Sequence, residues 1–482
     1  MYNVVKIAQC IEISKLGVAA LHFPEVDGHL QVNSQEKRKI MKETEVLHSA
    51  LSRRSLLVGM AAVGGTALLA SCSTGSKNAV ESTGAPSYDG PLIELSFWNG
   101  FTGGDGPFMK AMVKKFNAEN ENIVIKDNTI QWGDYYGKLA TAVSSGNGPD
   151  VGVMHIDTLA GFAARGVLAP LDDFAAAVGL EEADFDSVVW NAGTYSGKRF
   201  GIPLDVHPLG FYYNKGLFDK AGITSAPTDA KSWDDAVAAL KDNGVANPFW
   251  STSTWPAHLM FTALDAQFGG SLYSADSMKA TFNDEAGVAG LEWLTKWVKN
   301  GISPKNVSAD AQAQAFRQGK NAMTWDGIWM MNEWAKVDGL EWAAAPLPQI
   351  GSQPGVWAGS HNMVVTAQGA KDENKLAAAR VFLAYISANS IEWAKAGQVP
   401  ARNSVRESKE FAALTVQSAL ASQLPNIVYL PATAGINEVT GPGFEKAVNQ
   451  AILGKMSPKA ALDEAAKIAD KILADNRAKY GA

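Results

Sequence analysis

Four histidines after residue 90 are the side chains best suited to bind a metal ion. They are His155, His207, His258 and His361. Imidazole is a common zinc ligand, but a site formed by one helix or loop needs ligands only a few residues apart. No two of these histidines have such a spacing, so a metal site would require distant segments to converge in the fold. The sequence therefore predicts neither a metal site nor a cofactor.

Two pairs of adjacent aspartates could act as acid and base, but their positions favour a structural role. Asp172-Asp173 and Asp234-Asp235 lie where helices are expected to begin, and carboxylates there cap backbone N–H groups. The chain has no phosphate-binding loop, no His-Glu-x-x-His or Cys-x-x-Cys pair and no Gly-x-Ser-x-Gly nucleophile motif. The glycine-rich run 146–152 precedes an expected strand, whereas a dinucleotide-binding fingerprint follows one, so we interpret it as a turn.

Cys72 ends a segment that has the features of an export signal. Arg53 and Arg54 precede an apolar stretch that runs to Leu69, with small residues directly before the cysteine. Such a segment is typical of a cleaved signal and is too short to span a bilayer. Its Leu-Ala-Ser-Cys ending resembles a bacterial lipobox, and the paired arginines resemble a twin-arginine signal. We expect residues 1–71 to be removed and Cys72 to carry a lipid that holds the protein outside the cytoplasmic membrane.

Two alternatives bear on this leader. A buried core helix preceded by two arginines would leave the position of the cysteine unexplained. Met41 begins a more ordinary signal, which favours a start there over Met1.

Composition narrows the classes of function. A chain of 482 residues is long enough for two or three domains. A net charge of −7 without a basic stretch argues against nucleic acid and offers no attraction to anionic lipid. The only cysteines are Cys10 and Cys72, so the exported chain contains no disulfide. All 14 tryptophans lie at or after Trp98, and we expect part of this aromatic surface to contact a ligand.

The apolar pattern after the leader predicts strands that alternate with helices. Residues 72–90 are polar and rich in Ser and Gly, as in a flexible linker. This alternation indicates parallel, doubly wound sheets of the α/β class. On one helix, Trp293 and Trp297 are expected to face the core. Strands are expected near 93–97, 123–125, 150–154, 209–213, 322–325 and 363–365, and helices near 108–116, 135–143, 233–240, 291–299, 376–387 and 458–477.

Four motifs in order carry a resemblance to a known family. They are residues 132–139 (WGDYYGKL) followed by 146–151 (GNGPDV), 201–207 (GIPLDVH) running into 211–215 (FYYNK), 316–329 (FRQGKNAMTWDGIW) and 397–402 (GQVPAR). In this order they resemble the extracellular solute-binding proteins of ABC importers, specifically the sugar-capturing family that includes maltose-binding protein. The likeness covers nearly all of residues 91–480. The export signal agrees with it, because importers collect their cargo outside the cytoplasmic membrane.

The resemblance implies two doubly wound α/β lobes joined by hinge strands, which close on a ligand in the cleft between them. The chain is expected to cross between lobes near Leu204-Asp205, near Asn321 and near Thr366. This division assigns residues 91–203 plus 322–366 to the first lobe and residues 204–321 plus 367–482 to the second. Cleft residues should lie at strand ends and in the loops beyond them.

The resemblance also implies a site for a sugar, which needs fixed polar partners for its hydroxyls and aromatic planes for its C–H faces. His207 stands where the family presents a sugar-contacting acid, so the imidazole departs from the pattern. Trp255, in a Ser/Thr-rich loop, is a candidate stacking platform. The predicted ligand-binding residues are Trp98, Asn99, His155, Asp157, Asp205, His207, Trp255, Trp325, Asp326, Trp329, Gly359, Ser360, His361 and Arg402.

We therefore expect a lipid-anchored, monomeric receptor that binds a sugar or oligosaccharide without turnover and delivers it to an ABC permease. A receptor for glycerol phosphate or a compatible solute would need a cationic cluster or an aromatic box, and Arg402 alone does not decide between them. A retaining glycosidase would need two carboxylates about 5–5.5 Å apart, for which Asp157 and Asp205 are candidates. A metal-binding lipoprotein that uses the histidines is the least favoured alternative.

Overall fold

The computed structural model describes residues 87–481. The predicted export signal (residues 1–71), the predicted lipidation site Cys72 and most of the predicted linker (residues 72–90) lie outside the described residues. Within 87–481, no helix combines the length and the apolar character required to cross a bilayer.

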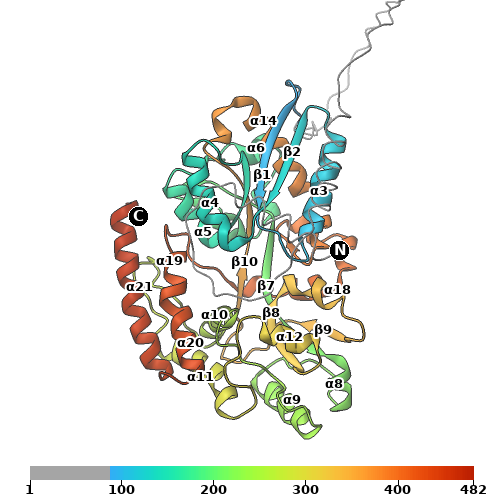
Figure 1. Ribbon diagram of the computed structural model, residues 1–482, viewed down its shortest axis with the longest axis vertical. Coiled ribbons are helices and arrows are strands. Elements are labelled where there is room, and N and C mark those ends of the chain that lie inside the picture. Colours follow the sequence, from blue (N-terminus) through green and yellow to red (C-terminus); the bar gives the residue numbers. More distant parts are fainter. Residues whose placement is uncertain (1–86, 482) are drawn as a thin grey trace, which may run out of the picture. The chain divides into compact units, whose positions relative to one another are not determined.

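A first sheet of five strands has the order β2-β1-β3-β11-β6. β1 pairs in parallel with β2 and β3, and β11 pairs antiparallel with β3 and β6. Helices follow β1, β2 and β3 in turn, which confirms the predicted strand–helix alternation (Figure 1). The elements are β1 (Ile93–Asn99), α3 (Gly106–Glu119), β2 (Ile123–Thr129), α4 (Trp132–Ser144), β3 (Val151–His155), α5 (Ile156–Ala164), β6 (Ile202–Pro203) and β11 (His361–Val365).

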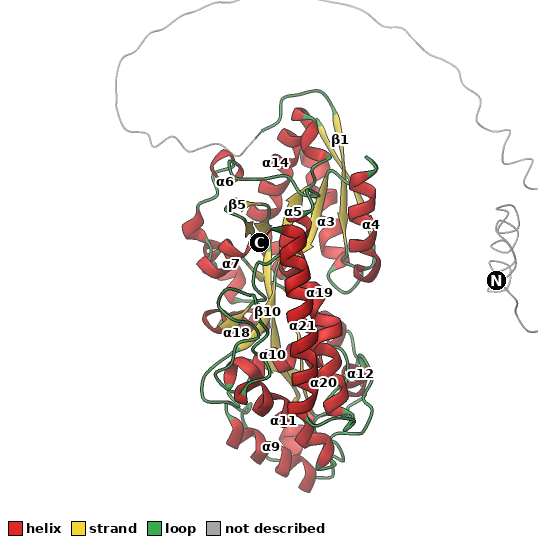
Figure 2. Ribbon diagram, turned by 90° about the vertical axis from the view of Figure 1, so that its left-hand side faces the viewer, coloured by secondary structure: helices red, strands yellow, loops and turns green. Residues whose placement is uncertain are grey.

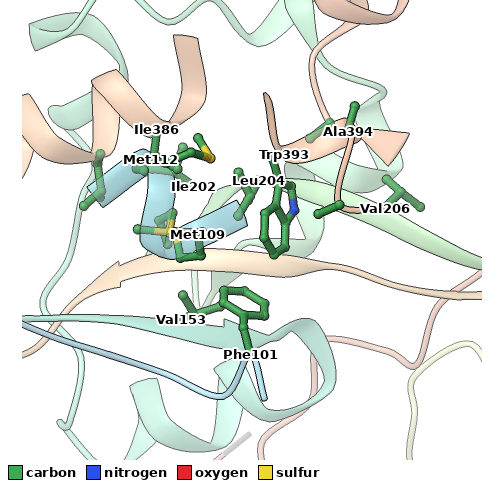
Figure 3. Close-up of a cluster of buried hydrophobic side chains, with 14 of the residues drawn as sticks. Phe101, Met109, Met112, Val153, Ile202, Leu204, Val206, Ile386, Trp393 and Ala394 are labelled. Carbon is green, nitrogen blue, oxygen red and sulfur yellow. The ribbon is translucent and has the colours of Figure 1, made fainter. Parts of the chain in front are cut away.

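Alternating apolar residues hold this sheet against its helices. Leu95 and Phe97 of β1 are fully buried, and the Phe97 ring meets Phe382 edge to face at 5.2 Å. Figure 3 shows side chains from helices, strands and the segments between them in one buried cluster. Burial of such side chains contributes about 1.5–3 kcal/mol each. The labelled members are Phe101, Met109, Met112, Val153, Ile202, Leu204, Val206, Ile386, Trp393 and Ala394.

A second sheet is organised by β7 (Asp205–Asn214), a strand of ten residues. Near its start β7 pairs antiparallel with β12 and β10, and towards its end with β8 and β9. Figure 1 shows β7 and β10 between the first sheet and the strands β8 and β9. The strands that pair with β7 are β8 (Met323–Gly327), β9 (Trp342–Ala345), β10 (Val356–Gly359) and β12 (Val399–Pro400), and β13 (Ile427–Val428) pairs in parallel with β10.

Helices rich in buried aromatic and aliphatic residues cover the second sheet (Figure 2). Trp293 and Trp297 are buried against Trp233, as predicted for core residues. The main helices are α9 (Ala230–Asp242), α10 (Ala257–Gln267), α11 (Glu285–Lys299), α12 (Ala311–Arg317), α19 (Asn437–Thr440), α20 (Lys446–Ile452) and α21 (Pro458–Tyr480).

Strand pairing divides the chain differently from the predicted lobe boundaries. Residues 322–366 were assigned to the first lobe, but β8, β9 and β10 pair with β7 in the second sheet. Residues 367–482 were assigned to the second lobe, but α14 (Glu373–Ala388) and α15 (Ser390–Ala394) pack with the first sheet, as Phe382 and Trp393 show. A local apolar pattern predicts that a strand exists, whereas its sheet is decided by long-range pairing.

The chain crosses between the two sheets at single residues. Leu204 lies between β6 and β7, and Ser360 lies between β10 and β11. Their backbones are tied to the opposite strand, because Leu204 N–H donates to the His361 carbonyl and Ile156 N–H donates to the Ser360 carbonyl. The first crossing lies at the predicted Leu204-Asp205. No crossing occurs near Asn321, because β8 directly after it pairs with β7 in the second sheet, and the other crossing lies at Ser360, six residues before the predicted Thr366.

Candidate functional site

A cavity of about 520 Å³ is lined by residues from both sheets. From the first sheet come the loop after β1, the start of α4, the end of β3 and the first turn of α5. From the second come β7, β10, α10 and the segment after β8. The volume is within the range of about 300–1,000 Å³ that is typical of small-ligand sites.

Asn99 shapes the loop after β1 without lining the cavity. Its amide donates to the Asp127 carboxylate at 2.6 Å, and its side-chain oxygen accepts from Phe101 N–H at 3.1 Å. These bonds fix the turn that presents Asp105 to the cavity. Burial raises the pKa of Asp105, and its Oδ1 has no hydrogen-bond partner among residues 87–481.

Three histidines, which we call the histidine cluster, converge on one side of the cavity. They are His155, His207 and His361, and one ring nitrogen from each lies within 4.8 Å of those of the other two. Strand register brings them together, because His361 of β11 is opposite His155 of β3, and Gly359 of β10 is opposite His207 of β7. The spacing along the sequence gave no sign of this convergence.

Asp205 is fully buried beneath the histidine cluster. Its carboxylate accepts from His207 Nδ1 at 3.1 Å, from His361 Nδ1 at 2.8 Å, from His361 N–H at 2.9 Å and from Trp393 Nε1 at 2.6 Å. Burial alone would raise the pKa of Asp205, but the attraction of His361 and the hydrogen bonds from both imidazoles lower it well below its usual range. The carboxylate is therefore ionised and saturated with donors.

Burial keeps the imidazoles of His207 and His155 neutral. Burial lowers the pKa of His207 to about 4 and lowers that of His155 well below its ordinary value. His155 Nδ1 lies 2.6 Å from Tyr136 Oη, which also accepts from the His155 backbone N–H at 2.9 Å. The Trp132 ring lies 4.3 Å from the His155 ring and extends this side of the cavity as an aromatic face.

Three tryptophans from the second sheet and its loops form what we call the tryptophan wall. They are Trp255, Trp329 and Trp357. Ring centroids are 6.0 Å apart for Trp255 and Trp329, and 6.3 Å apart and perpendicular for Trp329 and Trp357. Trp255 keeps 38% of its surface exposed, so its face is open to a ligand.

Two glycines allow the rings of His207 and Trp329 to lie close to the backbone. A Cβ at Gly359 would come within 2.2 Å of His207 Nε2, and a Cβ at Gly327 would come within 2.1 Å of the outer ring of Trp329. Both distances are far below van der Waals contact. Gly359 therefore acts through the space it leaves and has no side chain to offer a ligand.

Several cavity residues carry buried polar atoms without a partner among residues 87–481. They include Nδ1 of His258, both amide atoms of Gln398 and Oγ1 of Thr440. Buried polar groups are normally hydrogen-bonded, so these atoms are available to a polar ligand. Burial lowers the pKa of His258 to about 4, and it raises the pKa of Asp157, in the first turn of α5, to about 6.

Half of the predicted ligand-binding residues line the cavity and the rest lie elsewhere. Those at the cavity are His155, Asp157, His207, Trp255, Trp329, Gly359 and His361. Asn99 and Asp205 support the cavity from behind, and the Ser360 hydroxyl accepts from the Asn362 amide at 3.2 Å. Trp98, Trp325, Asp326 and Arg402 do not line it.

These four residues have structural surroundings of their own. Trp98 packs with an apolar cluster of the first sheet, and Trp325 is fully buried with its ring stacked on Trp293 at 5.2 Å. Asp326 accepts from Gly327 N–H and the Gln312 amide, and burial raises its pKa to about 7. Arg402 forms an ion pair with Asp184 at 2.6 Å. Because β8 is buried along its whole length, the cavity meets only the residues beyond its end.

The adjacent aspartates are also structural, although not as predicted. Asp172 accepts from Arg199 N–H, and Asp173 precedes α6 (Phe174–Ala177) without making a side-chain cap bond. α9 begins earlier than expected and is capped by Asp229, so Asp234 and Asp235 lie inside it and pair with lysines.

The sequence prediction missed several lining residues. Trp132, Tyr136 and Gln398 stand within the motifs quoted above, and Trp357 is two residues before Gly359, so motif position could have indicated all four. Asp105 and Glu333 carry no local signal. The enzyme alternative loses its candidate pair, because Asp205 does not line the cavity and its oxygens are occupied by four donors.

Comparison with known proteins identifies the fold and the family. The maltodextrin-binding protein MdxE of Bacillus subtilis is 24% identical over 373 residues, which cover 75% of this chain and 86% of that protein. The diacetylchitobiose binding protein DasA of Streptomyces coelicolor is 24% identical over 330 residues, which cover 67% of this chain and 76% of that protein. The GacH receptor of Streptomyces glaucescens superposes with a TM-score of 0.71 at 24% identity, covering 79% of this chain and 98% of that one.

The likeness to GacH confirms the predicted fold class of two α/β lobes joined by hinge strands. A family model described as bacterial extracellular solute-binding protein matches residues 111–416. This match spans more than half of the chain and includes all four motifs in full. The chain therefore belongs to the bacterial extracellular solute-binding proteins.

Proposed function

We propose that this protein captures a sugar or oligosaccharide outside the cytoplasmic membrane and delivers it to an ABC permease without chemical turnover. The observation that carries the proposal is a cavity with two aromatic faces whose lining residues also carry unpartnered polar atoms. Trp132 supplies one face, and the tryptophan wall supplies the other. Such planes suit the C–H faces of sugar rings, and fixed polar atoms suit hydroxyls.

Relatives support an oligosaccharide. MdxE and DasA are named for maltodextrin and diacetylchitobiose, and the structures of GacH include complexes with acarbose and an acarbose homolog. All three ligands contain linked sugar units. A cavity of about 520 Å³ offers room for more than one sugar ring.

The cavity does not favour an anionic solute such as glycerol phosphate. None of the described residues that line it is a lysine or an arginine, and Asp105, Asp157 and Glu333 add carboxyl groups. A cationic compatible solute is the second candidate, because a tryptophan cage beside carboxylates attracts a quaternary ammonium group. The two candidates differ in charge and therefore can be separated by binding measurements.

Delivery and attachment complete the proposal. A ligand that bridges both lobes favours a closed form to the extent that it binds that form more tightly than the open one. The lipid on Cys72 would keep the receptor at the membrane surface, where the permease recognises the closed form. The extracellular character of the family supports this location.

A thermal-shift screen tests the ligand class. Maltooligosaccharides and chitooligosaccharides are expected to raise the melting temperature, because they bind only the native protein, whereas glycine betaine is not. For the best sugar, Trp255→Ala should weaken binding about tenfold, the loss of one stacking face, when measured by calorimetry. Trp342→Ala removes an indole outside the cavity and should leave the affinity unchanged. A shift with betaine alone would replace the sugar proposal by the second candidate.

A further inference from the structure

The histidine cluster has the composition and spacing of a metal site. Its three ring nitrogens lie within 4.8 Å of one another, and all three residues line the cavity. Centroid separations are 4.3 Å for His207 and His361, 4.8 Å for His155 and His361, and 5.8 Å for His155 and His207. Nitrogen atoms within 4.8 Å of one another can bind one ion after small side-chain rotations, since zinc–nitrogen bonds measure about 2.0–2.1 Å.

The hydrogen bonds involve the same atom, Nδ1, of each ring. Nδ1 of His207 and Nδ1 of His361 donate to Asp205, and Nδ1 of His155 is paired with Tyr136 Oη. Among residues 87–481, no Nε2 atom of the cluster has a hydrogen-bond partner. An imidazole whose Nδ1–H is held by a carboxylate is the usual form of a metal-ligating histidine, because the carboxylate fixes the tautomer and the ring orientation.

The electrostatics also suit a cation. Asp205 is an ionised carboxylate directly beneath two of the rings, and the cavity carries the carboxyl groups of Asp105, Asp157 and Glu333 with no lysine or arginine among its described lining residues. Gly359 contributes space, because any side chain there would overlap His207 Nε2. A cluster that served only as packing would require neither three free Nε2 atoms nor a shared anion.

We infer that His155, His207 and His361 bind one divalent transition-metal ion of the zinc class through their Nε2 atoms, with an open coordination position directed into the cavity. Three imidazoles with a free fourth position match the ligand set of open zinc sites. Imidazole ligands select Zn²⁺, Co²⁺, Ni²⁺ or Cu²⁺ over Ca²⁺ and Mg²⁺, which prefer oxygen. The fourth position would accept water or a hydroxyl of the captured solute. This inference goes beyond sugar capture and does not depend on it.

The test uses the full-length protein without a polyhistidine tag, stripped with a chelator and titrated with Co²⁺ and Zn²⁺ in the absence of sugar. We expect one Co²⁺ per chain with the visible absorption of a four-coordinate site of three nitrogens and one water, displaced by an equimolar amount of Zn²⁺. Mg²⁺ and Ca²⁺ should not compete. His155→Gln and His207→Gln should each weaken Zn²⁺ binding at least 100-fold, and Asp205→Asn should weaken it 10- to 100-fold.

His258→Gln is the matched control, because His258 lines the cavity but lies outside the cluster. It should leave Zn²⁺ affinity and the Co²⁺ spectrum unchanged. His155 is only partly buried, so His155→Gln remains informative if His207→Gln fails to fold. Absence of Co²⁺ absorption in the wild-type protein, or full retention of affinity in folded His155→Gln, would overturn the inference.

Discussion

The histidine cluster and the tryptophan wall form two sides of one cavity but are built in opposite ways. Each Nδ1 in the cluster has a partner, and Asp205 beneath it accepts four hydrogen bonds from three residues. The wall makes no indole hydrogen bond within residues 87–481, and Trp255 is substantially exposed. The polar side is thus fixed before a ligand arrives, whereas the aromatic side can adjust its rings to the ligand.

The largest expected effect is a loss of stability when the carboxylate beneath the histidine cluster is neutralised. Asp205→Asn replaces an anion that accepts four bonds with an amide that must point a donor at other donors. We expect a loss of about 3 kcal/mol in the free energy of unfolding, measured in urea at pH 7. Asp326→Asn is the matched control, because Asp326 accepts only two bonds and has a pKa raised by burial to about 7. An equal loss of unfolding free energy in both variants would contradict the view that the hydrogen bonds of Asp205 fix this side of the cavity.

Substitutions at two glycines compare how rigidly the histidine cluster and the tryptophan wall are held. Gly359→Ala pushes against His207, which Asp205 holds in place, so we expect a loss of about 1–3 kcal/mol in unfolding free energy. Gly327→Ala pushes against the free end of the Trp329 ring, which can swing into the cavity. The second variant should therefore lose sugar affinity while keeping most of its stability. Calorimetry and urea unfolding on both variants distinguish this pattern from a uniform effect.

The smallest expected effect is the pH dependence of stability that His258, beside the tryptophan wall, contributes. Burial lowers the pKa of His258 to about 4, whereas an unfolded histidine titrates near 6.5. As the pH falls from about 6.5 towards 4, the unfolded chain binds a proton that the folded chain does not, so stability is lost. His258→Gln removes this contribution. Between pH 7 and pH 5 the variant should lose less unfolding free energy than the wild type, by on the order of 1 kcal/mol. Parallel curves of unfolding free energy against pH for the two proteins would contradict this prediction.

Local periodicity was sufficient to predict the main elements. The alternation of Leu95 and Phe97 predicted β1, and the apolar face from Met109 to Phe116 predicted α3. The run 146–152 was interpreted as a turn, and the Asp150 carboxylate within it accepts from Ser96 N–H of β1 at 2.9 Å. Each of these features depends on side chains a few residues apart or on one adjacent strand.

Features that depend on distant pairing were beyond the sequence. The sheet to which β8 belongs follows from its register with β7, and the histidine cluster follows from the register of β3 with β11. Trp325 and Trp329 look alike in the third motif, yet one ends in the core and the other at the cavity, because β8 ends between them. No local property of either tryptophan encodes that difference.

Ser360 has a mechanical consequence for the protein. It is the single residue between β10 and β11, just as Leu204 is the single residue between β6 and β7. In a rotation of one sheet relative to the other, these two neighbouring connections should move little, because each leaves a single residue between strands of different sheets. Gly359, His361 and Asp205 adjoin these two connections, so the distances between them should change little when the sheets rotate relative to each other.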